Sequence, residues 1–403
     1  MDFAVSEKMQ TILDMVRSFM DNVVIPLEGE MLFGQPADLD TAIARAQEKV
    51  HQMGLWASNH PVEFGGLGLN MVEHGLLSEA LGRSPLGHVV FGVQAPDAGN
   101  VEILHSHATD EQRERYLRPL VEGKIRSCFS MTEPEMPGSN PVLMGTSAVK
   151  DGRDYVINGH KWFTSSADGA DFAIVMAVTN PDAPPHQRAS MIHVHTETPG
   201  FNLVRNVSVM GDAGSGHASH AEIIYQSCRV PQSNLLGSEG DGFIIAQERL
   251  GPGRIHHCMR WLGIASRSFD MMCARANERV ITADGETLAD RQVIQHWAAE
   301  LDAEIRGARL QTLHAAWMID CHGVKAARDE ISAIKFSVAN TMLHAVDTAI
   351  QVHGALGVTD DTVLSHWYRH ERAARIYDGA DEVHKTTLGR RILRRYATVG
   401  ALR

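Results

Sequence analysis

The first third of the chain shows the hydrophobic spacing of helices. Between residues 5 and 25 apolar side chains recur every three to four positions, and the pattern ends before a proline. The same period returns over residues 71–81 and 97–104. Thr109, followed by two acidic residues, is typical of the start of another helix. We therefore predict an N-terminal all-α domain over residues 1–124.

The pattern then changes to that of strands, over residues 125–237. Short runs rich in β-branched and aromatic residues, such as 172–178 and 190–195, alternate with turn dipeptides. An Asp-Gly pair at 151–152 and an Asn-Gly pair at 158–159 bracket one such run and predict a hairpin. The stretch is predicted to form a compact β-barrel or β-sandwich domain.

Helical spacing returns in long segments over residues 238–403 and predicts a helical bundle. The order helices, strands, helices makes the fold class α+β and disfavours a Rossmann fold, which alternates strands and helices throughout. The motifs GxGxxG, GxxxxGK[ST] and GxSxG are also absent from the sequence. Two apolar faces mark the bundle: Ile294, Trp297, Leu301, Ile305 and Ala308 on one segment, and Ile334, Val338, Met342 and Val346 on another.

Composition excludes several function classes. Lysine and arginine number 37 against 49 aspartates and glutamates, a net charge of -12, so we expect no nucleic-acid binding. The sequence has no long uncharged apolar stretch and no signal peptide, so we expect a cytoplasmic protein with no membrane insertion. Five widely spaced cysteines predict reduced thiols. The 22 histidines show no metal-ligand spacing, and adjacent His256 and His257 would point in different directions on a helix, so no metal site is predicted.

Two segments of the strand region carry candidate chemistry. The segment MTEPEMPGS, residues 131–139, turns from a strand into a loop that exposes the hydroxyls of Thr132 and Ser139. It can bind the polar edge of a ring and a phosphate, or be a plain surface loop. In NGHKWFTS, residues 158–165, Phe163 and Ser165 share one face of a strand and would suit a planar cofactor. Taken alone, such a strand more often forms the core of a hairpin, with its hydroxyls in solvent, than a cofactor site.

A third pair of segments lies in the helical region. The glycines of QVHGALG, residues 351–357, permit close backbone approach to a phosphate. In IYDGADEVH, residues 376–384, Asp378 stands between an aromatic residue and a glycine. Its carboxylate can serve as a base or as a helix cap, and the residues alone leave both open.

Together these segments resemble the acyl-CoA dehydrogenase family, whose motifs MTEPxxxGS, NGxKWxT, QxxGxxG and IYxG occur here in the same order. The resemblance extends from the first helix to Arg395 and is strongest to the branch with members ten and eleven, on the run GPGRIHHCMR at 251–260. It implies FAD held between the β-domain and a four-helix bundle. It also implies a homotetramer built as a dimer of dimers.

The resemblance also assigns roles to individual residues. It makes Asp378 the catalytic base, in place of the glutamate usual in the family, because Gly253 occupies the alternative base position and cannot serve. Substrate contacts fall to Ser139, Arg254, Tyr377 and Gly379. Cofactor contacts fall to Phe129, Met131, Thr132, Phe163, Ser165, Arg279, Gln292, Gln351, Gly354, Ala355, Ala380 and Glu382, with Arg279 reaching the FAD of a neighbouring subunit.

The implied reaction is the α,β-dehydrogenation of an acyl-CoA thioester during fatty-acid β-oxidation. Asp378 would take the α-proton while flavin N5 takes the β-hydride, and an electron-transfer flavoprotein would accept the electrons. Two other functions stay open at this point. Nitroalkane oxidases share the fold and use an aspartate base with oxygen as acceptor, and a non-catalytic scaffold would keep the fold without the flavin.

Overall fold

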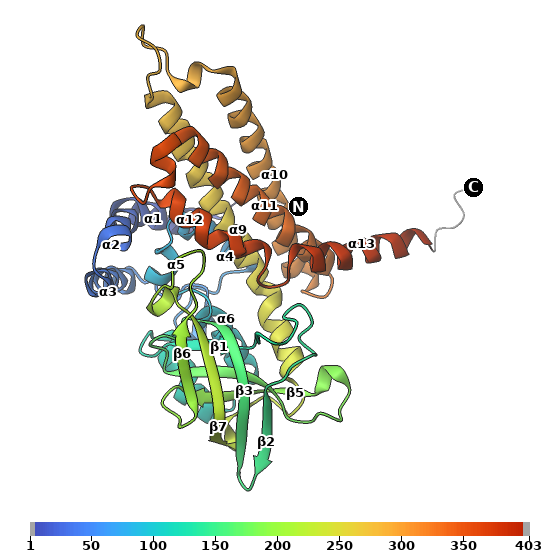
Figure 1. Cartoon of the computed structure of the whole chain (residues 1–403). Helices are drawn as coiled ribbons and strands as arrows, with labels where there is room; N and C mark the ends of the chain where they lie inside the picture. Colours follow the sequence, from blue (N-terminus) through green and yellow to red (C-terminus); the bar gives the residue numbers. More distant parts are fainter. Residues whose placement is uncertain (1–4, 398–403) are drawn as a thin grey trace. The chain divides into compact units, whose positions relative to one another are not determined.

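A computed structural model describes residues 5–397, and the chain divides into two compact units. A helical unit comprises Met1–Glu48, Leu69–Val90 and Gly251–Arg403, and a sheet unit comprises Lys49–Gly68 and Phe91–Leu250. Figure 1 labels most of the elements of both. The predicted order of helices, strands and helices is confirmed. The domain boundaries after residues 124 and 237 stay predictions.

The helical unit is built on long helices whose predicted apolar faces are buried. Ile334, Val338, Met342 and Val346 are all 1% exposed or less. On the neighbouring helix Ile294, Leu301, Ile305 and Ala308 are buried, as the period of 3.6 requires, while Trp297 of the predicted face is only partly buried. Its main helices are α1 (Glu7–Phe19), α2 (Glu28–Phe33), α3 (Pro36–Gln52, in this unit to Glu48), α4 (Met71–Leu81), α5 (Gly87–Val90), α9 (Gly242–Glu278, in this unit from Gly251), α10 (Gln292–His322), α11 (Arg328–His353), α12 (Val363–Glu371) and α13 (Asp381–Ala397).

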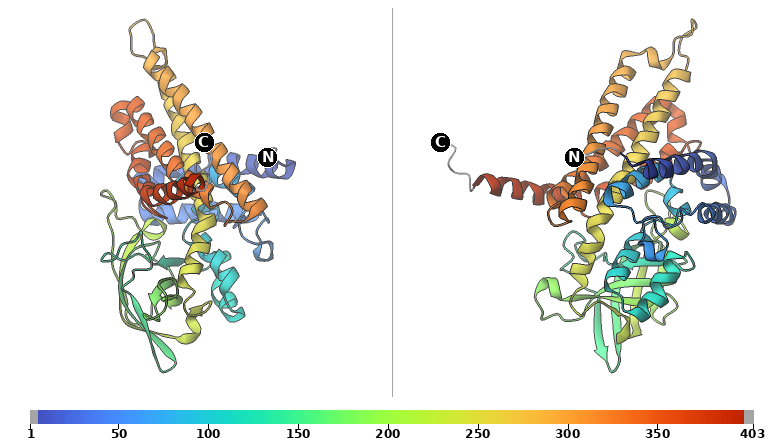
Figure 2. Two further views of the ribbon diagram at one scale, coloured as in Figure 1. Left: turned by 90° about the vertical axis from the view of Figure 1, so that its right-hand side faces the viewer. Right: turned by 180° about the vertical axis from the view of Figure 1, so that it is seen from behind.

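Helices α10 and α11 lie side by side in Figures 1 and 2 and are joined by polar contacts. His344 Nδ1 lies 2.9 Å from the Glu304 carboxylate, and Ser337 donates to Gln311 at 3.1 Å. Helix α4 begins at the predicted residue because Asn70 forms a capping box with Glu73. None of the described helices, α9 included, has an apolar stretch able to cross a bilayer.

The sheet unit is one eight-stranded sheet in the order β6-β7-β3-β2-β4-β5-β8, with β1 parallel to β4. Central β4 reads FAIVMAV because both of its faces are buried. Phe172, Ile174 and Met176 pack on α6 and its neighbours, and the alternate residues pack on β3 and β7. The unit contains α6 (Asp97–His107), α7 (Asp110–Gln112), α8 (Arg118–Val121), β1 (Ser127–Ser130), β2 (Ser147–Asp151), β3 (Asp154–Ser165), β4 (Phe172–Val178), β5 (Ala189–His195), β6 (Phe201–Asn206), β7 (His220–Pro231) and β8 (Leu235–Leu236).

One of the two predicted turns is wrong. Strands β2 and β3 do form a hairpin around Asp151 and Gly152, but β3 continues through Asn158 and Gly159 with a register shift against β7. A Cβ at Gly159 would lie 2.2 Å from the Thr146 hydroxyl oxygen, so the glycine permits a close approach within the sheet. The Asn158 side chain is also used there, because it accepts the Ser227 N–H at 2.7 Å.

Candidate active site

Asp378 lies in a tight turn of the helical unit that precedes α13. Its φ is 53° and that of the next residue, Gly379, is 98°. A left-handed conformation costs a non-glycine residue of order 1 kcal/mol or more, so the surrounding structure must hold it. Gly379 has a steric reason too, because a Cβ there would lie 2.7 Å from the His384 ring.

Long side chains from α9 and α11 hold the backbone of this turn. Arg254 donates from Nε and Nη2 to the Asp378 carbonyl at 3.2 and 3.1 Å, and His384 Nε2 lies 3.1 Å from the same oxygen. Lys335 donates to the carbonyls of Ala374 at 2.7 Å and Gly379 at 3.3 Å. Burial lowers the pKa of His384 to about 4, so this imidazole is neutral at pH 7 and can donate to the carbonyl.

The carboxylate of Asp378 is held by His257, whose Nε2 lies 3.2 Å from Oδ2. The imidazole ring stacks against the Trp261 ring, with the centroids 6.0 Å apart, and its centroid lies 5.4 Å from that of the Tyr377 ring. Burial is the main reason that the pKa of His257 falls to about 4. The Asp378 charge opposes this shift, and the charges of Arg260 and Lys335 add to it. A neutral imidazole carries its proton on one of its two ring nitrogens, and Nε2 is the nitrogen that lies beside the Asp378 carboxylate.

A buried ion pair fixes the aromatic residues around His257. Arg260 donates to Glu371 at 2.8 Å and to the Tyr377 hydroxyl at 3.0 Å, and Trp261 donates to the same two groups at 3.2 Å. Burial opposes ionisation of Glu371, but Arg260 holds its pKa below the ordinary value. The side chains beside Asp378 are therefore held in place by hydrogen bonds.

In the sheet unit, a second buried ion pair fixes the loop after β1. Lys161, wholly buried on β3, donates to the Met131 carbonyl at 2.8 Å and to Glu133 at 3.0 Å. Glu133 in turn accepts the N–H groups of Gly145 at 2.6 Å and Thr146 at 2.8 Å. The Thr132 carbonyl accepts the N–H of Trp162 at 3.0 Å, so the loop is joined to β3. A hollow in this loop is lined by Met131, Thr132, Glu133, Met136, Pro137, Gly138, Pro141, Leu143 and Met144.

Phe163 is an exposed aromatic residue held in an unusual backbone conformation. Its φ is 48° and it is 41% exposed, within a bulge of β3 between Lys161 and Thr164. Because of the bulge, the alternation of side chains along a strand does not determine on which face Phe163 lies. Phe163 and Ser165 nevertheless both contact His220. Ser165 Oγ lies 2.8 Å from His220 Nδ1, and the Phe163 and His220 ring centroids are 5.9 Å apart.

Comparison with known proteins places this chain in a family. Models of the N-terminal, middle and C-terminal domains of acyl-CoA dehydrogenases match residues 6–124, 128–228 and 240–393. The probable acyl-CoA dehydrogenase FadE2 of Mycobacterium tuberculosis is 44% identical over 412 residues, covering 98% of this chain and 98% of that protein. The chain is a member of the acyl-CoA dehydrogenase family. It is thus an oxidoreductase acting on CH–CH donors.

Relatives of this acyl-CoA dehydrogenase include proteins twice its length. Acyl-CoA dehydrogenase family member 11 of Gallus gallus is 40% identical over 399 residues, which are 96% of this chain but only 51% of that protein. A solved structure of an acyl-CoA dehydrogenase described as putative, from Mycobacterium abscessus, superimposes with a TM-score of 0.92 at 36% identity, covering 98% of this chain and 100% of that one. The chain therefore spans nearly all of some relatives and about half of others.

The predicted site residues of this family member fall into separate groups. Arg254, Tyr377, Gly379 and Ala380 gather around the Asp378 turn, and Met131, Thr132, Phe163 and Ser165 belong to the loop and strand just described. Exposed Ser139 lies further along the loop, and Phe129 carries the Arg249 guanidinium 4.2 Å above its ring. The remaining predicted residues are at helix ends: Arg279 and Gln292 flank the α9–α10 connection, Gln351, Gly354 and Ala355 lie where α11 ends, and Glu382 opens α13.

Sequence reasoning missed four residues that the structure brings to these groups: His257, Lys335 and His384 around Asp378, and His220 beside Ser165. His257 had a usable signal, since it follows Arg254 by three residues and so lies on the same face of α9. The prediction that His256 and His257 point apart is confirmed, because the His256 ring packs on His74 instead.

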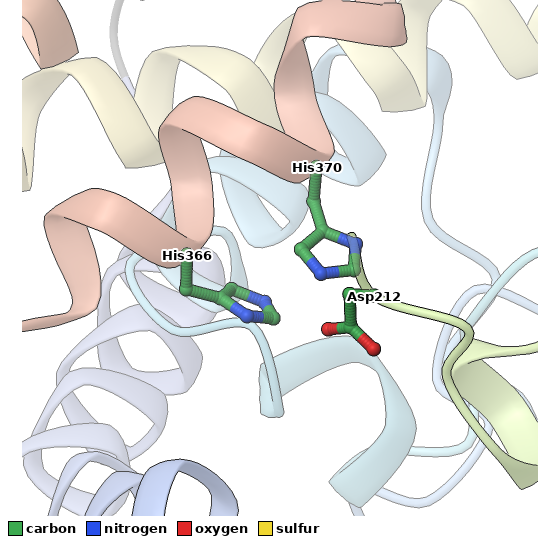
Figure 3. Close-up of side chains that lie close together, drawn as sticks. All are labelled: Asp212, His366 and His370. Atoms are coloured by element: carbon green, nitrogen blue, oxygen red, sulfur yellow. The ribbon is translucent and has the colours of Figure 1, made fainter. Parts of the chain in front are cut away.

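Two further histidines lie one turn apart on α12, outside the predicted site. The rings of His366 and His370 stack with their centroids 4.1 Å apart, as Figure 3 shows. Two imidazoles are fewer ligands than a protein zinc site uses. Figure 3 also draws Asp212, which belongs to the sheet unit and is not part of α12. The absence of a metal site stays a prediction.

Replacing Lys161 with methionine is expected to lower the free energy of unfolding by about 3–5 kcal/mol, because Glu133 would keep a buried charge without its partner. Urea unfolding followed by circular dichroism measures the loss. A double variant, Lys161→Met with Glu133→Gln, removes both charges and should recover part of the stability. A loss below about 1 kcal/mol in the single variant would show that the pair does not hold the loop.

Proposed function

We propose that this protein is a FAD-dependent acyl-CoA dehydrogenase in which Asp378 is the catalytic base. The observation that carries the proposal is the state of the Asp378 carboxylate. Its Oδ2 lies 3.2 Å from His257 Nε2, on a turn whose carbonyl accepts hydrogen bonds from Arg254. A base must be held within reach of the proton that it removes, and this side chain is held at both its backbone and its carboxylate.

The residues of the sheet unit fit a flavin. Phe163 offers an exposed aromatic face despite the cost of its positive φ, and the Ser165 hydroxyl lies beside it. Thr132 is also exposed, on a loop that the Lys161–Glu133 pair holds in place. An aromatic face with neighbouring hydroxyl donors suits a planar ring with polar edges. When bound, FAD would supply a two-electron acceptor for the β-hydrogen of the substrate, at flavin N5.

Asp378 removes the α-proton of the acyl thioester, and the electrons of that C–H bond form the new α,β double bond. Negative charge develops on the thioester oxygen in the transition state, so N–H groups of the 378–380 turn would stabilise it. Tyr377, whose hydroxyl is held by Arg260 and Trp261, would limit the space beside the acyl chain. The product is a trans-2-enoyl-CoA.

Arg279 supports an assembly of several subunits. It follows Arg254 by 25 positions on or just after α9, which corresponds to about 37 Å along a helix. A residue so far from Asp378 cannot serve the same site, but it can contact the FAD of a neighbouring subunit. We propose a homotetramer, with an electron-transfer flavoprotein as acceptor, acting in fatty-acid oxidation in the cytoplasm.

Mixing the FAD-loaded protein with acyl-CoA in the absence of oxygen is expected to bleach the flavin absorbance, while nitroethane leaves it unchanged. A panel of acyl chains, including 4-hydroxyacyl forms, with ferrocenium as acceptor would then define the substrate. Bleaching by nitroethane alone would support a nitroalkane oxidase. A colourless protein that takes up no FAD would support a scaffold without catalysis.

A further inference from the structure

Helix α9 contacts residue 378 at two separate points. Arg254 binds its backbone carbonyl with two hydrogen bonds, and His257 binds its carboxylate. Residues three apart on a helix lie on one face, so a single helix face holds both ends of this residue. The two contacts have different consequences, because the first fixes the turn and the second fixes the rotation of the side chain.

Asp378 needs the second contact more than a glutamate would. The aspartate carboxylate is one methylene nearer to its backbone, so it has fewer torsions with which to reach a substrate. Its terminal torsion joins an sp³ to an sp² carbon and is broad, so the backbone alone does not fix the direction of the two oxygens. His257 Nε2 lies 3.2 Å from Oδ2, and a hydrogen bond between them would restrict that torsion and so set where both oxygens point.

The surroundings of His257 favour a hydrogen-bond donor over a second charge. Arg260, Lys335 and Arg254 are cations near Asp378 or His257, and Glu371 is already paired with Arg260. Burial is the largest penalty on a charged imidazole, and together with the repulsion of Arg260 and Lys335 it outweighs the attraction of Asp378 and Glu371. The Trp261 and Tyr377 rings confine the imidazole on two sides, so the orientation of the ring is restricted.

We propose that His257 is a positioning residue that donates a hydrogen bond to Asp378 and thereby orients the carboxylate for removal of the substrate α-proton. This inference rests on the proposed function of Asp378. His257 itself does not exchange the proton. It acts through Asp378, and its loss should slow proton removal without weakening the binding of FAD.

Three variants of His257 test this role. His257→Leu removes the donor, His257→Gln keeps an N–H at a reach similar to that of Nε2, and His257→Asn keeps the amide but withdraws it by one methylene. His256→Leu is a matched control, because it makes the same change one position along α9 on a side chain that packs on His74. The readouts are the limiting rate of anaerobic flavin reduction, the substrate concentration that half-saturates it, the FAD content and the melting temperature.

We expect His257→Leu and His257→Asn to lower the limiting rate of flavin reduction by about 10²-fold, the typical cost of a misplacement of about 1 Å. Half-saturation and FAD content should stay close to those of the wild type. His257→Gln should recover most of the rate, and His256→Leu should retain it. An α-deuterated substrate should show a larger isotope effect in the slow variants, because proton removal then limits the rate.

Two results would overturn the proposal: a normal rate in His257→Leu, or equal rates in His257→Gln and His257→Asn. The second comparison holds even if the leucine variant fails to fold. Crystal structures of the glutamine and asparagine variants provide a readout without substrate, since the carboxylate of Asp378 should be rotated only in the latter. If no acyl-CoA reduces the wild-type flavin, the proposed function fails, while these structures still decide whether His257 orients Asp378.

Discussion

Asp378→Asn is expected to lower the rate of flavin reduction by acyl-CoA by about 10²–10⁴-fold, the usual contribution of a general base. Asparagine has nearly the same shape, and its side-chain oxygen can still accept the hydrogen bond from His257. The turn and the FAD content should therefore remain as in the wild type. Stopped-flow absorbance in the absence of oxygen measures the loss directly.

Asp378→Glu is the matched control for this substitution. It keeps a carboxylate but moves it one methylene further from the backbone, away from the position at which the Asp378 carboxylate contacts His257. We expect a rate between those of the wild type and the asparagine variant. If Asp378→Asn instead reduces its flavin within about tenfold of the wild-type rate, the base is another residue.

Acidification from pH 7 to pH 4.5 is expected to destabilise the protein strongly, because several histidines are buried in the neutral form. Burial lowers the pKa of His193 and His88 to about 3, and that of His257 and His384 to about 4. Between these values and the ordinary 6.5, the unfolded chain binds more protons than the folded one. Stability is therefore complete above pH 6.5 and is lost as the pH falls, by on the order of 3 kcal/mol for one fully shifted histidine.

His193→Phe tests this explanation at a single position. His193 is wholly buried between Tyr116 and Phe172, and among the described residues neither of its ring nitrogens has a hydrogen-bond partner. A phenyl ring fills a similar space and cannot take up a proton. Urea unfolding at pH 5 and pH 7 should show a smaller loss of stability in the variant than in the wild type. An equal loss in both proteins would place the acid sensitivity elsewhere.

Sequence periodicity predicted the long elements well, because burial of one helix face or of both strand faces leaves a regular pattern. The helix at 71–81 and the strand at 172–178 have the predicted ends. The turn predicted at the Asn-Gly pair 158–159 does not form. The glycine is needed there because Thr146, from another part of the chain, packs closely against it. Local chemistry cannot reveal such a reason.

The parts of the candidate site that lie in short continuous motifs could be predicted from the sequence. The segment around Asp378 and the loop at 131–139 stand out in the sequence, but apart from His384 their supports come from far away along the chain. His257 precedes Asp378 by 121 positions and Lys335 precedes it by 43. Their roles depend on how α9 and α11 pack against the turn, and that packing is a property of the whole helical unit.

Different neighbours contact the backbone and the side chain of residue 378, and this bears on how the identity of a base can change within a fold. In this turn Arg254, Lys335 and His384 hydrogen-bond to main-chain oxygens, so these bonds do not require a particular side chain at position 378. A shorter acid can thus occupy the position while the peptide path stays the same, provided that one neighbour on α9 adapts to the new reach. The conformation of the turn is thereby set by one group of residues, and the acidic side chain that the turn carries can differ without changing it.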